Sequence, residues 1–432
     1  MKLCMIGTGY VGLVSGVCFS DVGNTVYCVD KDQKKIDLLN KGIVPIFEPG
    51  LEEILKKNYK EKRLIFTSDL KTAVINSDII FICVGTPTKK NTNSADLKYV
   101  FSVAKDLKKI IKKYKIIITK STVPVTTGDK IEKILTNLKK KKLVDVVSNP
   151  EFLREGDAIR DFIYPDRVII GTDSNKANRI LKSLYFPIIK KTSRYFNTSR
   201  RGAELIKYAS NAFLATKISF INEIANLCEK VGVDIKDVSL GMGSDERIGD
   251  RFLRAGPAYG GSCFPKDTRA LIDIGNKFKT DLSIVKSVVN SNNNRKNLLI
   301  KRVVKILGGN LKNKIITFLG VTFKPNTDDM REASSIPMIE YLNKKKSKIK
   351  YYDPSGEKND FKGLNNVSYC NTISSACLNA DLVILHTEWN DFKLLNFKKI
   401  IRKKKFKIYD MRNMYSSLRM KKLNIDYFGV GR

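Results

Sequence analysis

Short apolar runs alternate with amphipathic stretches through the first 195 residues. The runs have the length of buried β-strands, and residues 96–113 between two of them carry apolar positions at helical spacing. Chains that alternate in this way build a parallel sheet with helices on both faces. We therefore predict a doubly wound α/β domain over residues 1–195, with strands at residues 2–6, 25–29, 79–84, 115–119, 143–147 and 167–170.

After residue 195 the pattern changes from alternation to helix. Residues 201–231 keep helical spacing of apolar side chains over their whole length, which predicts one long helix. A helix of this length between two sheet domains is also a natural surface for a homodimer. The polar segment 290–297 predicts a junction or a helix end. We expect residues 196–300 to form a central helical region.

Residues 301–432 return to alternation. A second, smaller doubly wound domain is predicted there, with strands at residues 314–319, 349–352, 382–385 and 407–409.

The first predicted strand is followed by Gly7-Thr8-Gly9-Tyr10-Val11-Gly12, and the second ends on Asp30. Glycines at this spacing allow a tight turn and close approach of a pyrophosphate, and the acid accepts from a ribose hydroxyl. This context predicts a dinucleotide site and a fold of two Rossmann-like domains joined by the central helical region. Asp30 favours NAD over NADP, although Lys31, Lys34 and Lys35 could accept a 2′-phosphate.

A potential nucleophile lies in Gly260-Gly261-Ser262-Cys263-Phe264-Pro265-Lys266-Asp267. Pro265 is typical of a first helical turn, so Cys263 is predicted at a helix N-terminus, where backbone N–H groups favour the thiolate. Lys266 adds a positive charge, and Asp267 shares the helix face of the cysteine. The alternative is a buried cysteine that acts as a small hydrophobe.

Three loops leave the carboxyl ends of the predicted strands, where cofactors bind in such sheets. They carry Thr86 in segment 85–88, Thr122 in segment 121–124, and Glu151 and Glu155 in segment 149–156. Such side chains are often helix caps, but a pair of acids in a basic chain also suggests chemistry.

Two pairs of residues, each with at least one cation, complete the candidates for catalysis and binding. Lys207 and Asn211 project from one helix face, where an ammonium and an amide could stabilise an oxyanion. Lys324 and Arg331 lie in the first loop of the second sheet and could contact phosphates of a nucleotide that belongs to the substrate.

Composition excludes several classes. The chain has 432 residues, enough for two or three domains, and contains no apolar run that would cross a membrane. Its eight cysteines include no Cys-x-x-Cys pair, so no metal site is expected and a reducing cytosol fits best.

The formal charge of +35 raises the alternative of a basic nucleic-acid-binding protein. The lysines are spread along the chain without interleaved aromatics, so we expect no nucleic-acid partner; the charge would draw in phosphorylated ligands. The single histidine, His386, follows a predicted strand and is expected to have no chemical task.

These segments together resemble the UDP-glucose/GDP-mannose dehydrogenase family. The resemblance covers the whole chain and rests on the glycine fingerprint, segments 149–156, 204–211 and 260–267, and Phe323-Lys324 with Arg331-Glu332. It implies an NAD-dependent oxidation of the C6 alcohol of a nucleotide sugar to a carboxylate, through a thiohemiacetal and a thioester on Cys263. The implied catalytic residues are Cys263, Lys207, Asn211, Asp267, Glu151 and Thr122.

The resemblance also assigns binding residues. Implied NAD contacts are Gly7, Gly9, Tyr10, Val11, Gly12, Asp30, Lys35, Thr86, Thr122, Glu155, Lys266 and Arg331. Implied nucleotide-sugar contacts are Phe152, Leu153, Arg154, Glu155, Lys207, Arg247, Phe252, Leu253, Arg254, Ala255, Gly256, Gly260 and Lys324. Segment 252–260 is most similar to members that act on UDP-glucose, so UDP-glucose is the expected substrate, with GDP-mannose and UDP-N-acetyl sugars as alternatives. We expect the protein to be a cytoplasmic homodimer.

Overall fold

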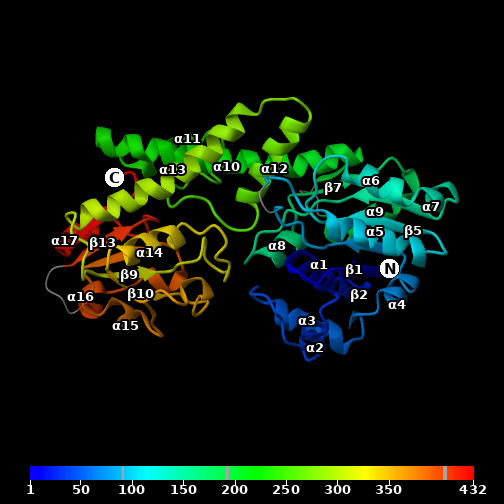
Figure 1. Cartoon of the computed structure of the whole chain (residues 1–432), viewed down its shortest axis with the longest axis horizontal. Coiled ribbons are helices and arrows are strands. Elements are labelled where there is room, and N and C mark those ends of the chain that lie inside the picture. The colour runs from blue at the N-terminus through cyan, green and yellow to red at the C-terminus, as the bar shows by residue number, and fades with distance from the viewer. Residues whose placement is uncertain (90–91, 190–193, 402–405) are drawn as a thin grey trace. The chain divides into compact units, whose positions relative to one another are not determined.

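The computed structural model describes residues 1–89, 92–189, 194–401 and 406–432 (Figure 1). The chain forms two compact units. Unit 1 comprises residues 1–210 and 273–279, and unit 2 comprises residues 211–272 and 280–432.

Unit 1 is built on an eight-stranded sheet of order β3-β2-β1-β4-β5-β6-β7-β8. Neighbouring strands are parallel except β6 and β7, which pair antiparallel at Ser148 and Gly171. All six predicted strands are present; β3 and β8 were not predicted. The strands are β1 (Lys2–Ile6), β2 (Thr25–Val29), β3 (Leu64–Thr67), β4 (Ile79–Ile82), β5 (Lys115–Thr119), β6 (Val144–Ser148), β7 (Arg167–Gly171) and β8 (Arg194–Thr198).

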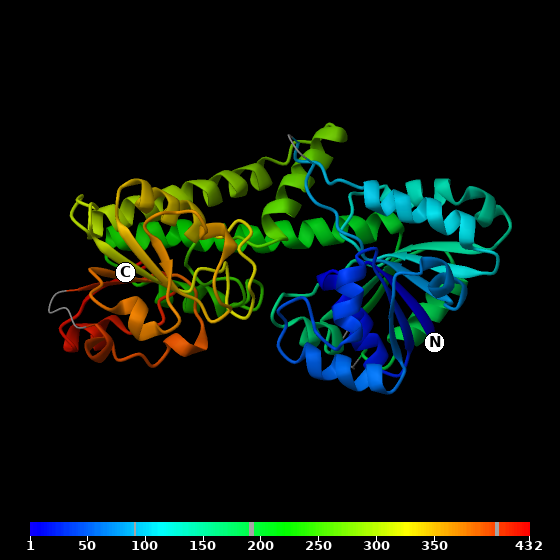
Figure 2. The same ribbon diagram turned by 60° about the horizontal axis from the view of Figure 1, so that its bottom comes forward.

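Helices cover both faces of this sheet (Figure 2). Successive strand residues point to opposite faces, so Met5 and Phe81 pack in the core with α1, α3, α8 and α9, whereas Ile6 and Ile82 pack in the core with α4, α5 and α6. The helices are α1 (Tyr10–Asp21), α2 (Gln33–Asn40), α3 (Leu51–Lys60), α4 (Leu70–Ile75), α5 (Lys98–Ile110), α6 (Thr127–Ile134), α7 (Thr136–Lys140), α8 (Ala158–Ile163) and α9 (Asn175–Tyr185).

Unit 2 contains a six-stranded parallel sheet of order β11-β10-β9-β12-β13-β14. Its strands are β9 (Ile315–Leu319), β10 (Lys348–Tyr352), β11 (Val367–Tyr369), β12 (Leu382–Leu385), β13 (Lys407–Asp410) and β14 (Asp426–Gly429). Its outer elements are α14 (Ser335–Lys344), α15 (Ile373–Cys377), α16 (Phe397–Ile400), α17 (Ser417–Lys422) and the short 3-10 helices η1 (Asn359–Phe361) and η2 (Asn390–Phe392). The second doubly wound domain is therefore confirmed.

The central region is helical, as predicted. Its long helix, α10 (Arg200–Val231), begins in unit 1 and continues into unit 2. It is followed by α11 (Ile235–Gly243), α12 (Phe264–Lys277) and α13 (Ser283–Ile306). Among the described residues, no helix is long and apolar enough to span a bilayer.

The predicted junction at residues 290–297 is wrong, because α13 runs through this segment without a break. Two polar side chains of this segment, Asn292 and Arg295, are buried rather than solvated. Asn292 bonds both backbone groups of Tyr259, with its Oδ1 accepting at 2.8 Å and its Nδ2 donating at 3.0 Å. Arg295 donates to the carbonyl of Gly256 at 3.0 Å. These side chains hold the backbone of residues 256–259 instead of ending the helix.

Candidate active site

The glycine loop connects β1 to α1, and its two ends pack closely against each other. Gly7 adopts a positive φ of 101°, and its N–H donates to Val29 at 2.7 Å. A Cβ on Gly12 would lie 1.8 Å from the Gly7 carbonyl oxygen, whereas one on Gly9 would meet nothing within 4 Å. The loop therefore packs tightly on its inner side and leaves space at Gly9, which fits a bound pyrophosphate.

Asp30 follows β2 and braces this loop. Its Oδ2 accepts from the Thr8 N–H and hydroxyl, both at 2.8 Å. Lys35 lies 3.3 Å from the same oxygen. Burial opposes the charge, but the Thr8 hydrogen bonds and the Lys35 ammonium outweigh it and lower the pKa of Asp30. The carboxylate is therefore ionised at neutral pH and fit to accept from a ribose hydroxyl.

Two further loops of unit 1, segments 85–88 and 121–124, meet at the same edge of the sheet. The hydroxyl of Thr86 donates to the carbonyl of Thr122 at 2.9 Å. A small cavity of about 10 Å³ lies beside Thr122, which fits about one water molecule. Its lining comprises Thr119, Ser121, Thr122, Val123, Ser148, Pro150, Glu204 and Lys207.

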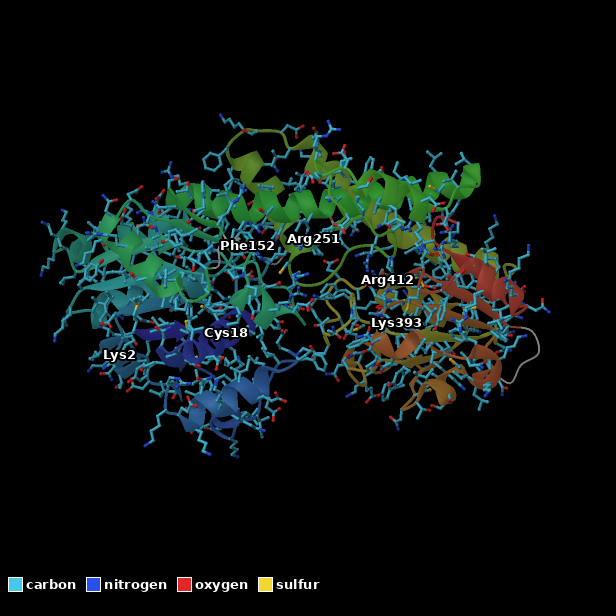
Figure 3. All side chains as sticks on the ribbon, turned by 180° about the vertical axis from the view of Figure 1, so that it is seen from behind. Lys2, Cys18, Phe152, Arg251, Lys393 and Arg412 are labelled. Atoms are coloured by element: carbon cyan, nitrogen blue, oxygen red, sulfur yellow. The ribbon has the colours of Figure 1, made fainter. Side chains whose placement is uncertain are left out.

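Glu151 and Lys207 form a buried ion pair in unit 1, with 3.1 Å between Oε1 and Nζ. The other Glu151 oxygen accepts from the Leu153 N–H at 2.6 Å, which folds segment 149–156 around the carboxylate. The Lys207 ammonium also lies 5.1 Å from the ring centre of Phe152, labelled in Figure 3. A buried cation and a buried carboxylate in contact can stabilise an oxyanion and exchange a proton.

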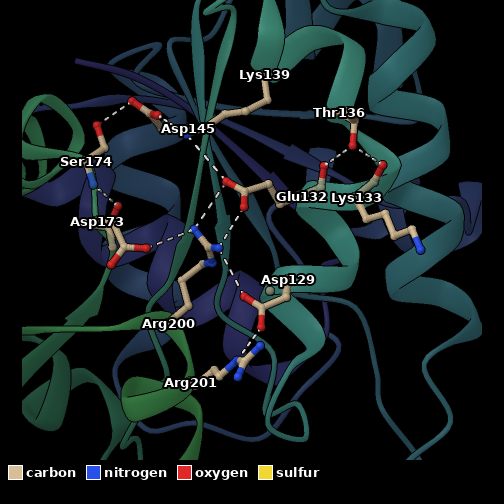
Figure 4. Close-up of polar contacts among 12 residues, drawn as sticks. Asp129, Glu132, Lys133, Thr136, Lys139, Asp145, Asp173, Ser174, Arg200 and Arg201 are labelled. Carbon is tan, nitrogen blue, oxygen red and sulfur yellow. Dashed lines mark hydrogen bonds and ion pairs between the residues drawn. The ribbon is translucent and has the colours of Figure 1, made fainter.

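The position of Lys207 depends on how α10 begins. Its first two residues are arginines, which the helix dipole disfavours there. Arg200 pairs with Asp129 at 3.1 Å and Glu132 at 2.9 Å, and Arg201 pairs with Asp129 at 2.6 Å (Figure 4).

Glu204, one turn further on, anchors the same helix. Its carboxylate accepts from the backbone N–H groups of Thr126 at 2.8 Å and Gly128 at 2.7 Å. Burial raises the pKa of Glu204 to about 7. The start of α10 is thus fixed to α6, and Lys207 is held on it.

The second group of predicted catalytic residues lies in unit 2. Cys263 directly precedes α12, and its carbonyl accepts the first helical bond from Asp267 at 2.8 Å. Its Sγ lies 3.5 Å from the Ser262 hydroxyl. Cys263 is partly exposed, which contradicts the alternative of a buried hydrophobe; Cys4, Cys18, Cys28, Cys83, Cys228 and Cys377 are buried.

Asp267 is fully buried and contacts two other predicted residues. Its Oδ2 accepts from the amide of Asn211 at 2.6 Å, and its Oδ1 contacts the Lys266 ammonium at 2.6 Å. Asn211 and Asp267 are therefore fixed by each other, four residues from Lys207 and Cys263 along their respective helices.

The residues expected to bind the nucleotide end gather in unit 2. The Gly261 N–H donates to the Arg331 carbonyl at 2.7 Å, and a Cβ on Gly260 would lie 2.7 Å from the Glu332 oxygen. Segment 252–260 therefore packs against the loop that follows β9. It contains Phe252, Leu253, Arg254, Ala255 and Gly256; Lys324 lies in the loop.

Three predicted arginines are paired with acids. Arg154 and Asp161 form two hydrogen bonds, of 2.9 Å and 2.6 Å, in unit 1. In unit 2, Arg331 pairs with Asp329 at 2.7 Å, and Arg247 pairs with Asp245 at 2.6 Å.

Unit 1 contains the predicted residues Gly7, Gly9, Tyr10, Val11, Gly12, Asp30, Lys35, Thr86, Thr122, Glu151, Phe152, Leu153, Arg154, Glu155 and Lys207. Unit 2 contains Asn211, Arg247, segment 252–256, Gly260, Cys263, Lys266, Asp267, Lys324 and Arg331. The expected NAD contacts from Lys266 and Arg331 stay predictions, since the glycine loop lies in unit 1.

Sequence reasoning missed a buried cation, Lys120, which follows β5. Its ammonium donates to Asn149 at 3.3 Å and Tyr185 at 3.4 Å, and burial lowers its pKa to about 8. A lysine directly after an apolar strand, at the edge where ligands bind, was the available signal. Within the described residues, no cluster of His, Cys, Asp or Glu could hold a metal ion.

Three family models match the chain in succession. They are the NAD-binding domain (residues 1–189), the central domain (residues 201–294) and the UDP-binding domain (residues 317–417) of the UDP-glucose/GDP-mannose dehydrogenase family.

Relatives match over the full length. A UDP-glucose 6-dehydrogenase from Rhizobium meliloti (strain 1021) is 46% identical over 435 residues, covering 100% of both chains. The UDP-glucose 6-dehydrogenase YwqF from Bacillus subtilis (strain 168) is also 46% identical, covering 100% of this chain and 98% of the relative. Among solved structures, a UDP-glucose dehydrogenase from Pyrobaculum islandicum superimposes with a TM-score of 0.90 at 34% identity, covering 99% of this chain and 97% of that one.

Proposed function

The chain belongs to the UDP-glucose/GDP-mannose dehydrogenase family, and we propose that it oxidises UDP-glucose to UDP-glucuronate with NAD through a covalent intermediate on Cys263. The observation that carries the proposal is the partly exposed Cys263 directly before α12, four residues from the buried Asp267.

The residues of unit 1 fit NAD. The closed inner side of the glycine loop and the space at Gly9 suit the pyrophosphate, and ionised Asp30 suits the ribose. Bound NAD supplies a hydride acceptor for each of the two oxidations. Thr86 and Thr122 lie at the same sheet edge and help to define that side of the site.

Lys207 and Asn211 stabilise oxygen charge on the sugar carbon. The Lys207 ammonium is buried against Glu151, so it is preorganised and interacts strongly with an alkoxide. Glu151, whose carboxylate pairs with the Lys207 ammonium, accepts a proton from the substrate hydroxyl or from water. Asn211 is oriented by its hydrogen bond to Asp267.

Cys263 traps the aldehyde that the first oxidation forms. Its thiolate sulfur, favoured by the helix N-terminus, bonds to the carbonyl carbon and gives a thiohemiacetal. The second oxidation gives a thioester, and water then breaks the carbon–sulfur bond to release the carboxylate and the thiol. Asp267 or Glu151 accepts the proton of that water.

Unit 2 holds the nucleotide end of the substrate. Segment 252–260 and the loop after β9 pack together there, with Lys324 and Arg331 as cations for the diphosphate. Phe152, Leu153, Arg154 and Glu155, in segment 149–156 of unit 1, stay predicted contacts of the nucleotide sugar.

The protein works as a cytoplasmic homodimer that forms through α10. An exposed apolar stripe runs along the part of α10 in unit 2, and it comprises Phe213, Phe220, Leu227 and Val231. Phe213 is 67% exposed and Leu227 56%, which is unusual for a helix that stays uncovered. Arg247 is exposed as well, and the family resemblance assigns it to the substrate of the second copy.

The proposal is tested by the NADH yield on a panel of UDP- and GDP-sugars. Two NADH per UDP-glucose are expected, and no turnover on GDP-mannose or UDP-N-acetyl sugars. Cys263→Ser should abolish UDP-glucuronate formation while NAD still binds. Acid production by that variant at the wild-type rate, or no NADH from UDP-glucose, would overturn the proposal.

A further inference from the structure

One buried carboxylate, Glu48, joins the glycine loop to segment 149–156. It precedes α3 in unit 1 and is 8% exposed. Nothing in the chemistry described above uses it, although its partners belong to both ligand-binding loops.

The first partner is Tyr10, which opens α1 directly after Gly9. The Tyr10 hydroxyl donates a hydrogen bond to Glu48 Oε2. Burial and this hydrogen bond both raise the pKa of Tyr10, so the phenol keeps its proton and donates. The carboxylate is thereby fixed to the loop that we expect to hold the pyrophosphate.

The other partners are backbone N–H groups at the end of segment 149–156. Gly156 donates to Oε2 at 2.6 Å and also to the Tyr10 hydroxyl at 2.9 Å. Ala158 donates to Oε1 at 2.8 Å. Both oxygens are therefore occupied by donors, and the Gly156 N–H contacts Tyr10 and Glu48 at once.

This arrangement requires a carboxylate. An amide would have one acceptor oxygen, and its NH₂ group would face either the Gly156 N–H or the Ala158 N–H. One buried donor would then lose its partner, and the segment end would loosen.

We propose that Glu48 is a positioning residue that couples the cofactor loop to the substrate loop, so that occupation of the dinucleotide site changes the affinity for the nucleotide sugar. The inference rests on the proposed function, in which residues 152–155 contact the UDP-sugar. When the bound cofactor restricts the motion of Tyr10, the hydrogen bonds of Glu48 restrict Gly156 as well, which directly follows residues 152–155.

The test uses the full-length protein and the non-reacting pair NADH and UDP-glucose. Calorimetry gives the Kd of UDP-glucose with and without saturating NADH, and the ratio of the two is the coupling factor. We expect a wild-type ratio of about fivefold or more. Glu48→Gln should bring the ratio close to one and raise the KM for UDP-glucose about tenfold, with a smaller change in kcat.

Two further variants separate coupling from folding. Tyr10→Phe removes one hydroxyl and should also lower the ratio, while leaving the fold intact. Glu52→Gln is the matched control, because Glu52 is an exposed acid on α3 that pairs with Lys56; it should behave as wild type. A wild-type ratio of one, or an unchanged ratio in both Glu48→Gln and Tyr10→Phe, overturns the inference. The NADH yield of the wild type tests the proposed function separately.

Discussion

The two sheets follow the same plan over six strands, and the acid after the second strand of each differs in exposure. If the strands are numbered along the chain within each sheet, both sheets have the order third, second, first, fourth, fifth, sixth, and the sheet of unit 1 continues with a seventh and an eighth strand. The turn after the first strand is also alike. Gly7 donates to Val29 at 2.7 Å in unit 1, and Gly320 donates to Tyr352 at 2.8 Å in unit 2.

In each unit an acid after the second strand accepts from that turn. Asp30 accepts from the Thr8 N–H at 2.8 Å, and Asp353 accepts from the Val321 N–H at 2.8 Å. The side chain of Asp30 is 17% exposed, whereas that of Asp353 is fully buried near Lys358. The same brace is thus open to a ligand in unit 1 and sealed inside unit 2.

The loops explain this difference. In unit 1, α1 starts at Tyr10, so few residues stand between the glycine turn and the helix. In unit 2, α14 starts only at Ser335, and Thr322 in the long intervening segment also donates to Asp353, at 3.4 Å. Thr322 and Ser335 bond within this segment, to Lys324 and Val321. A ligand in unit 2 therefore meets the long loop instead of the acid.

The largest expected effect is on stability and comes from substitution of Asp353, the buried acid of unit 2. Asp353→Ala leaves the Val321 N–H without its acceptor and removes the negative charge that lies 3.9 Å from the buried Lys358 ammonium. We expect the free energy of unfolding to fall by about 3–5 kcal/mol. Urea denaturation followed by circular dichroism measures it. A loss below about 1 kcal/mol would show that Asp353 does not brace unit 2.

Substitution of Asp30, the partly exposed acid of unit 1, should lower activity with NAD more than stability. Asp30→Ala removes a ribose acceptor and the Thr8 brace, so kcat/KM for NAD should fall by about 10- to 100-fold. Stability should change far less than in Asp353→Ala, because Asp30 is partly solvated. Initial rates with NAD and NADP measure the effect. An unchanged preference for NAD over NADP would contradict the role given to Asp30.

The residue that follows the fourth strand also differs between the two units. Its substitution in unit 2 is expected to change stability at neutral pH less than the two substitutions above. Cys83 holds this place in unit 1 and His386 in unit 2, each bonded to the end of the first strand at 2.8 Å and 3.1 Å. Burial and the Arg412 charge lower the pKa of His386 from 6.5 to about 3. Its ring contacts the Ser334 hydroxyl at 2.9 Å.

The unfolded chain therefore binds a proton at His386 below pH 6.5, whereas the folded chain does so only near pH 3. This contribution to stability is present above pH 6.5 and is lost as the pH falls towards 3. His386→Gln should cost about 1 kcal/mol at pH 7.5, and the gap to wild type should narrow by pH 4.5. Denaturant midpoints at both pH values check this; a constant gap would be inconsistent with a buried neutral imidazole.

Much of the first sheet was predictable from sequence, because its central strands are buried on both faces and form continuous apolar runs. The strands β3 and β8 were missed. β3 alternates buried and half-buried residues over only Leu64–Thr67, and β8 is a polar edge strand. Their pairing is set by neighbours that are distant in sequence.

The site was predictable only where residue type is informative. The glycine fingerprint, Cys263 and Lys207 have distinctive local contexts. Asp353 repeats the role of Asp30, but its turn lacks the glycine spacing, so the likeness emerges only from the hydrogen bonds. Glu48 and Lys120 act through contacts with residues that are distant in sequence, which local sequence patterns do not reveal.

The burial of six thiols has a practical consequence. Burial raises the pKa of Cys4, Cys18, Cys28, Cys83 and Cys377, and only Cys263 and Cys370 are partly exposed. An alkylating reagent applied to the native protein should therefore modify two peptides, and a Cys370→Ser background reduces them to one. Peptide mass spectrometry could then follow the nucleophile directly, with the other native cysteines left in place.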